Sequence, residues 1–309
     1  MCTHPDLVGR RSLGKLEHLQ MLHLQPCRDG MRWVQVFDDA PLLSELVLTG
    51  SPDNFPRSLP WNQMNKFTFS GESELWTVDQ ILALPWELMP IHSSFFAHAS
   101  MKWSAEAPGQ CRAVSCRAST IELRLKIVNR SQRALGKLLS RLTFTNLSKL
   151  TLRPLYTSGN PTWCQEEFKQ LRTQSMFENT LTHLTLLFVI KQTELLETLR
   201  TLPALEFLRI GDTVQPALVN IVNNDLLHTL AVPGSMLQNL REFEAEVPHG
   251  PHGISRPALS AFMTRNSILL DTPTLKATFF VEKEYERNVK QRLKTVPGCQ
   301  WAVLEFSGV

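Results

Sequence analysis

The strongest constraint on the fold of this chain is a Leu-x-x-Leu-x-Leu pattern that recurs along it. Two clear copies, separated by 24 residues, are found at Leu181, Leu184 and Leu186 and at Leu205, Leu208 and Ile210. Between them lie leucines at helical spacing, followed by Pro203. A fixed spacing of this size is typical of stacked repeats, in which each unit completes the core of its neighbour. The stretch therefore predicts a strand, a helix and a second strand.

Further copies of the pattern extend over most of the chain. They begin at Leu19, Leu43, Met64, Thr120, Leu147, Leu240 and Leu275. In three copies a proline stands two residues before the first leucine, at Pro41, Pro203 and Pro273. Because proline has no amide hydrogen and clashes with a preceding helical turn, it ends a helix and directs the chain into the next strand.

The repeats predict the fold class. Strand and helix units joined by right-handed crossovers place parallel strands side by side, with the helices on one face. We therefore expect an α/β fold: an irregular leucine-rich-repeat solenoid, or horseshoe, with a parallel concave sheet and outer helices. It would form a single domain over residues 1–309, with an irregular or poorly ordered insertion around 85–116 and a C-terminal cap around 282–309.

Composition excludes several classes of protein. The net charge is +3, from 32 Lys and Arg against 29 Asp and Glu, which is far from the one-sided balance of a nucleic-acid or membrane surface. The longest apolar stretch, 184–190, is far below the roughly 18 residues of a membrane span, and the N-terminus lacks the apolar core of a signal peptide. An intracellular location, in cytoplasm or nucleus, is expected.

The sequence predicts neither a cofactor nor a metal site. The six cysteines form no Cys-x-x-Cys pair. Cys111 and Cys116 are close in sequence but have no second pair of ligands nearby, and His249 and His252 lie in a Pro- and Gly-rich turn without accompanying Cys or carboxylate residues.

Residues that alternate with the buried leucines are predicted to face outward on the concave sheet. This register gives a candidate partner-binding set: Glu122, Arg124, Lys126, Lys149, Thr151, Arg153, His183, Thr185, Arg209, Glu242, Glu244 and Glu246. The set contains a basic patch on successive strands and an acidic ridge at 242–246. A slip of one residue would turn each of these side chains inward. A sheet that faces water carries polar residues in any case, so the pattern fits both a plain surface and a binding patch.

No catalytic motif is present. The chain has no Gly-x-Ser-x-Gly, Gly-x-x-x-x-Gly-Lys, Gly-x-Gly-x-x-Gly or His-Glu-x-x-His sequence. A non-enzymatic protein is expected, and the alternative is a hydrolase that uses Cys164 or His183. Trp61 and Trp163 are interpreted as plugs between a helix and the sheet, with binding anchors as the alternative.

The lead-ins PLLSELVL, PALEFLRI and PTLKATFF, with LPWNQMNKFTF and NLREFEAEV, resemble the F-box and leucine-rich-repeat proteins abundant in mushroom-forming fungi. The resemblance covers most of the chain except about 85–116. It implies a protein-protein interaction module, similar to the substrate-recognition region of an F-box subunit of a cullin-RING ubiquitin ligase. In that family an F-box docks on a Skp-type adaptor, and the repeats bind the substrate protein.

The resemblance extends to the repeat region only. No F-box is visible, because the first repeat begins at Leu19 and leaves no room for such a module before it. Adaptor binding is therefore expected only if an F-box lies upstream. The alternative is a free-standing leucine-rich-repeat scaffold or inhibitor unrelated to ubiquitin transfer.

Overall fold

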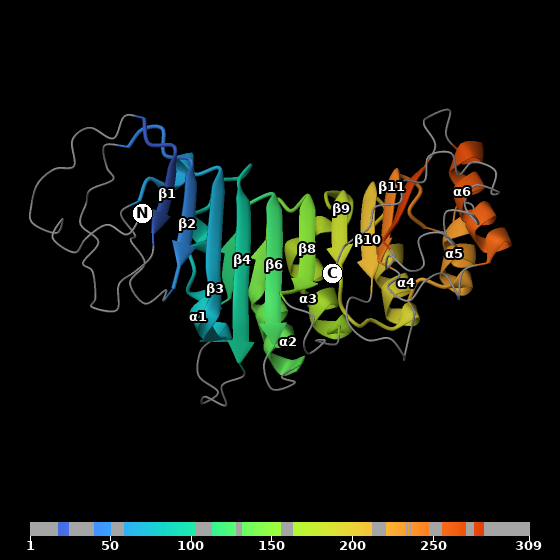
Figure 1. Ribbon diagram of the computed structural model, residues 1–309, viewed down its shortest axis with the longest axis horizontal. Helices are drawn as coiled ribbons and strands as arrows, with labels where there is room; N and C mark the ends of the chain where they lie inside the picture. The colour runs from blue at the N-terminus through green and yellow to red at the C-terminus, as the bar shows by residue number, and fades with distance from the viewer. Residues whose placement is uncertain are drawn as a thin grey trace, which may run out of the picture.

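The chain forms an α/β structure built on one long parallel sheet (Figure 1). The computed structural model describes residues 18–24, 40–50, 59–102, 113–127, 132–155, 163–211, 221–232, 234, 236–246, 255–269 and 275–280. The ten strands of this sheet are β1 (Met21–Leu24), β2 (Glu45–Thr49), β3 (Lys66–Thr77), β4 (Ser94–Lys102), β6 (Thr120–Ile127), β8 (Lys149–Pro154), β9 (His183–Leu186), β10 (Phe207–Gly211), β11 (Glu242–Glu246) and β12 (Lys276–Phe280).

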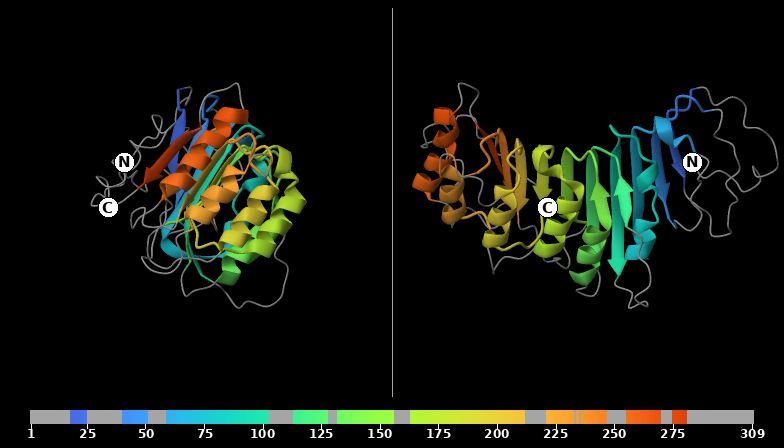
Figure 2. Two further views of the ribbon diagram at one scale, coloured as in Figure 1. Left: turned by 90° about the vertical axis from the view of Figure 1, so that its right-hand side faces the viewer. Right: turned by 180° about the vertical axis from the view of Figure 1, so that it is seen from behind.

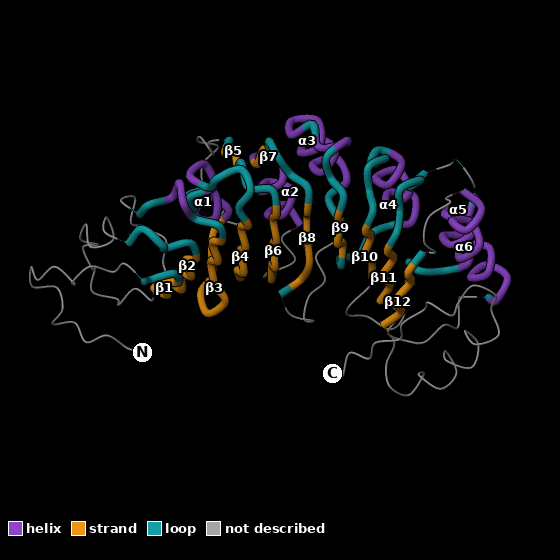
Figure 3. Tube along the Cα trace, turned by 90° about the horizontal axis from the view of Figure 1, so that it is seen from above, coloured by secondary structure: helices purple, strands orange, loops and turns teal. Residues whose placement is uncertain are grey.

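The described helices all lie on one side of this sheet. They are α1 (Val78–Leu82), α2 (Gln132–Arg141), α3 (Gln165–Ser175), α4 (Gln192–Arg200), α5 (Asn224–Ala231) and α6 (Arg256–Leu269), with short 3-10 turns η3 (Trp61–Gln63), η4 (Trp86–Leu88) and η6 (Phe177–Asn179). On the same side, β5 (Val114–Cys116) pairs in parallel with β7 (Leu142–Phe144). The strands of the large sheet follow one another in chain order, and Figures 2 and 3 show the bowed row of strands with the helices behind it.

Strict alternation of burial explains why these segments are strands. In β6 every second residue is buried, so apolar side chains point toward the helices and polar ones point away. The inward residues of adjacent strands share one register: Leu150 pairs with Leu184, Leu184 with Leu208, and Leu208 with Phe243. These four side chains are at most 1% exposed. The core is thus a continuous apolar layer between sheet and helices.

A line of hydrogen bonds crosses the sheet just before the strands begin. The Ser148 carbonyl accepts the amides of Thr182 and His183, and the Ser119 carbonyl accepts those of Ser148 and Lys149. Hydroxyl groups reinforce this line, because Ser148 Oγ donates to Ser119 O and Thr182 Oγ1 donates to Ser148 O, each at 3.1 Å. Satisfying these backbone groups at the strand entrance fixes the register of each strand against the previous one.

The interval around 85–116, for which the sequence analysis expects an irregular insertion, contains a full strand of the sheet. In β4 the inward side chains Phe95, Ala97, Ala99 and Met101 are completely buried. Phe95 stacks on Trp86 with ring centroids 3.8 Å apart. The leucine pattern did not predict this strand, because aromatic and small side chains occupy most of the inward positions at which the other strands carry leucine. Residues 103–112 lie outside the described part of the chain.

Two repeat assignments need correction. Ile121 pairs with Leu150, so the repeat assigned to Thr120, Leu123 and Leu125 begins two residues earlier, at Ala118. The last repeat was assigned with Thr278 inward, but Thr278 pairs with the outward-facing Glu244, and the inward residues are Ala277 and Phe279. The sequence Ala-Thr-Phe-Phe offers apolar side chains in both registers, which explains the slip of one residue.

The two tryptophans occupy the position predicted for plugs. Trp61 and Trp163 are 5% and 8% exposed, and they pack against Phe67 and Phe168, respectively. In the described part of the chain, no helix combines the length and apolar character needed to cross a membrane. The C-terminal cap expected around 282–309 lies outside the described residues.

Candidate interaction surface

The face of the large sheet opposite the helices, here called the open face, carries the outward side chains of its strands (Figure 3). None of the described helices lies over it. All twelve candidate partner-binding residues occupy outward positions, where none is fully buried. Glu122, Arg124 and Lys126 lie on β6; Lys149, Thr151 and Arg153 on β8; His183 and Thr185 on β9; Arg209 on β10; and Glu242, Glu244 and Glu246 on β11.

The register of the strands arranges these residues in rows that cross the sheet. The middle row runs, strand by strand, through Thr68, Phe96, Glu122, Thr151, Thr185, Arg209, Glu244 and Thr278. In the row on one side of it Arg124 pairs with Arg153, and in the row on the other side Lys149 pairs with His183. Residues far apart in sequence therefore form one surface.

The Glu122 cluster is the most connected group on this surface. The Glu122 carboxylate accepts from Arg124 Nε, and it lies 3.8 Å from Arg153 Nε and 3.8 Å from His98 Nε2. Its side chain is only 16% exposed, whereas those of Arg124 and Arg153 are 34% and 31% exposed. One largely buried carboxylate thus lies beside two arginine side chains that are each about one third exposed.

The electrostatics of Arg153 reflect this crowding. Burial lowers the pKa of the Arg153 guanidinium, and the nearby Arg124 lowers it further, while Glu122 acts in the opposite direction. Arg153 nevertheless remains a cation near neutral pH, because the guanidinium group of arginine stays protonated in proteins. The pair Arg124 and Arg153 is therefore a site of concentrated positive charge that Glu122 only partly offsets.

The Arg209 cluster lies farther along the open face. Arg209 forms ion pairs with Glu244 at 3.2 Å and Glu246 at 2.8 Å, and its guanidinium carbon lies 4.5 Å from the centroid of the Phe280 ring. Gly211 makes room for this arrangement, because a Cβ placed there would lie 2.4 Å from the Cβ of Glu246. Two carboxylates of the acidic ridge predicted from sequence, Glu244 and Glu246, thus pair with one cation, whereas Glu242 pairs with Lys276.

Lys149 and His183 are neighbours in the row that also contains Phe207. The His183 ring stacks on Phe207 with centroids 5.6 Å apart, and its Nδ1 lies 2.9 Å from Thr182 Oγ1. Burial and the adjacent Lys149 both lower the pKa of His183. Lys149 itself is exposed, and no ion pair joins it to any carboxylate in the described part of the chain.

Sequence reasoning missed the contribution of β4 to the open face. His98 belongs to the Glu122 cluster, and the ring of Phe96 lies under Lys66 Nζ at 5.8 Å. The missed signal was the period-two alternation of SFFAHASMK, which contains no leucine. Phe280 was missed as an outward residue because of the slipped register of the last repeat.

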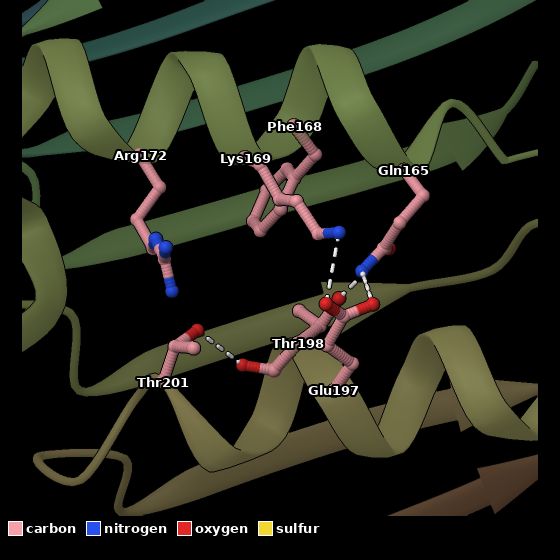
Figure 4. A pocket seen from close by; sticks show the side chains of 7 residues that line it. All are labelled: Gln165, Phe168, Lys169, Arg172, Glu197, Thr198 and Thr201. Carbon is pink, nitrogen blue, oxygen red and sulfur yellow. Dashed lines mark hydrogen bonds and ion pairs between the residues drawn. The ribbon is translucent and has the colours of Figure 1, made fainter.

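On the helical side, a hollow of about 40 Å³ lies between α3 and α4 (Figure 4). Lys169 forms ion pairs with Glu166 and Glu197, each at 2.8 Å, and Gln165 Nε2 donates to Glu197 at 3.0 Å. Thr198 Oγ1 donates to Gln165 Oε1 at 3.1 Å. This volume holds only about one to three water molecules. The contacts join the two helices to each other, so we interpret the hollow as a packing feature.

The alternative hydrolase hypothesis names Cys164 or His183, and these two residues lie on opposite sides of the sheet. Cys164 precedes α3 on the helical side, whereas His183 lies on the open face. Burial raises the pKa of the Cys164 thiol to about 11, with a further contribution from Glu167, whereas a nucleophilic cysteine requires a lowered pKa. The direction of the pKa shift at Cys164 is therefore opposite to that of a nucleophilic cysteine.

Comparison of the chain with protein-family models gives no match, and comparison with curated proteins gives none either.

Proposed function

We propose that this chain is a non-enzymatic protein-interaction module whose open face binds a partner protein. In this proposal the ten-stranded sheet and its helices are a leucine-rich-repeat solenoid. The observation that supports it best is the Glu122 cluster, in which two accessible arginines are fixed side by side on a rigid sheet. Arginine is enriched among the residues that dominate binding energy at protein interfaces.

The resemblance of the repeats to F-box and leucine-rich-repeat proteins directs the proposal to one biological setting. The chain would act like the substrate-recognition region of an F-box subunit in a cullin-RING ubiquitin ligase. Tagging the gene in its own organism and identifying co-purified proteins by mass spectrometry tests this setting. Recovery of a Skp-type adaptor and a cullin supports a ligase subunit. Recovery of partners without them contradicts it and leaves a free-standing scaffold or inhibitor.

Charge reversal on the two sides of the molecule tests the binding surface. The open-face variant R124E/K149E/R153E is expected to lose the partner proteins that the unmodified chain captures. The matched control is R133E/K191E/R200E, which makes the same three charge reversals at exposed positions on the helical side. Equal loss from both variants, or loss from the control alone, would refute binding through the open face. Circular dichroism of both variants verifies that they are folded.

A further inference from the structure

The open face presents an uneven distribution of charge over β6 and β8. Arg124, Lys126, Lys149 and Arg153 are four cations there, and the described carboxylate that contacts both arginines is Glu122. Glu122 engages both guanidinium groups through their Nε atoms, on one edge of each group. Each guanidinium has five N–H donors in a fixed fork, so its terminal donors are available to a second anion.

The two basic positions are separated by a distance that the strand itself sets. Lys149, Thr151 and Arg153 are alternate residues of β8, so they share the open face. With a rise of about 3.3 Å per residue, the backbones of Lys149 and Arg153 are about 13 Å apart. Thr151 lies between these two ends, and its neighbours in the same row are Glu122 on β6 and Thr185 on β9. A ligand that lies along β8 therefore meets two cationic points separated by the short side chain of Thr151.

This spacing matches an extended peptide. In an extended chain the side chains of residues i and i+4 lie on the same face and are also about 13 Å apart. In a helix the same two residues are only about 5–6 Å apart. We propose, resting on the proposed function, that the partner contributes an extended acidic segment that lies along β8, with two carboxylates four residues apart bound by Lys149 and by the Arg124–Arg153 pair.

The charge on the rest of the open face favours an acidic protein segment over a nucleic acid. A polyanion that crossed the sheet from β8 would approach Glu242, Glu244 and Glu246 on β11. A short acidic segment along β8 avoids these carboxylates. The low net charge of +3 is likewise unlike that of a chain that binds nucleic acid through its phosphates.

Selection of peptides by the folded chain tests the proposal. A random nonapeptide library displayed on phage is selected on the immobilised full chain, and the enriched sequences are compared with the unselected library. The expected result is enrichment of Asp or Glu pairs at positions i and i+4. For an enriched synthetic peptide, Arg153→Gln is expected to weaken binding roughly tenfold and Lys149→Gln roughly threefold in fluorescence anisotropy. The matched control R133E/K191E/R200E is expected to bind that peptide as the unmodified chain does.

Reversal of specificity provides a stricter test. Selection on the K149E/R153E variant is expected to enrich Lys or Arg in place of Asp or Glu. The proposal is overturned if acidic pairs show no preference for the i, i+4 spacing, or if Arg153→Gln and Lys149→Gln leave peptide binding unchanged. Competition by a single-stranded oligonucleotide that equals or exceeds the peptide would likewise overturn it. If partner capture still depends on the open face in any of these cases, the proposed function stands without this inference; if capture does not, both are refuted.

Discussion

The inward and outward faces of the same strands differ in what they contribute to the molecule. On β9, Leu184 is completely buried between Leu150 and Leu208, while the next residue, Thr185, faces the open side between Thr151 and Arg209. Inward positions form a continuous apolar layer, and outward positions form charged clusters around Glu122 and Arg209. The backbone is shared, but the continuous burial of apolar side chains, which is the dominant favourable contribution to folding, lies on one face.

The two faces therefore tolerate different amino-acid substitutions. A buried methylene contributes about 0.8 kcal/mol through transfer from water, whereas an exposed or half-exposed ion pair contributes about 0–1 kcal/mol. The inward face therefore fixes the fold, and the outward face is free to vary in charge while the fold persists. In the proposed function, such a division would leave binding specificity adjustable without loss of structure.

The largest effect that tests this comparison is expected at Leu184. Leu184→Ala removes a fully buried side chain from the centre of the sheet and leaves a cavity, so the free energy of unfolding is expected to fall by about 2–5 kcal/mol. Chemical denaturation followed by circular dichroism measures the loss. The adjacent substitution Thr185→Ala is the control and is expected to change the free energy by no more than about 0.5 kcal/mol. Equal losses at both positions would break the distinction between the faces.

An intermediate effect is expected from the hydrogen bonds at the strand entrances. Thr182→Val keeps the shape of the side chain but removes the hydroxyl that donates to Ser148 O, and we expect a loss of about 1 kcal/mol in unfolding free energy. Thr173→Val is the matched control, because it removes an exposed hydroxyl-to-carbonyl bond within α3 and is expected to cost under about 0.5 kcal/mol. If Thr182→Val costs no more than the control, the hydroxyls do not stabilise the register.

The inward layer was largely predictable from sequence, because leucine at fixed spacing is a strong signal. Repeats with Leu or Phe at the inward positions, such as those at Leu43, Met64, Leu181 and Leu205, were placed correctly. The leucine pattern missed β4, with its inward Phe95 and Ala97, and it placed the repeat at Thr120 two residues late. It placed β12 one residue out of register because both faces of that strand carry apolar groups.

The sequence predicted which residues lie on the open face, but not which of them contact one another. Alternation from the leucines identifies which residues point outward, so all twelve candidates were placed on this face. It does not give the neighbours of a residue on the next strand, because the loop lengths between strands differ. The joining of His98, Arg124 and Arg153 around Glu122 is a tertiary contact among three strands, and it required the structure.

A smaller effect is expected from Arg153. Arg153→Gln removes one of the guanidinium groups near Glu122 on a face that is open to solvent, and the free energy of unfolding is expected to fall by less than about 1 kcal/mol. Denaturation at low and high salt measures it, with a smaller difference between variant and unmodified chain at high salt, where screening is stronger. A loss above about 2 kcal/mol would show that the Glu122 cluster is part of the structural core, and would weaken its assignment to binding.

The smallest effect is expected from the titration of His183. Burial and then Lys149 lower the pKa of His183 below its ordinary value of 6.5, while the carboxylates of Glu206 and Glu242 act against this shift. Above pH 6.5 the imidazole is neutral in both folded and unfolded chains, and its contribution is fully retained. As the pH falls through 6.5, the unfolded chain takes up the proton more readily, so the folded state loses stability.

His183→Gln is therefore expected to reduce the dependence of unfolding free energy on pH just below 6.5. Lys149→Met, which removes the neighbouring cation, is expected to raise the pKa of His183 in an NMR titration of its ring protons. A His183 pKa at or above 6.5 in the unmodified chain would contradict the sheltered position of this ring. In that case His183 would behave as a freely solvated surface group.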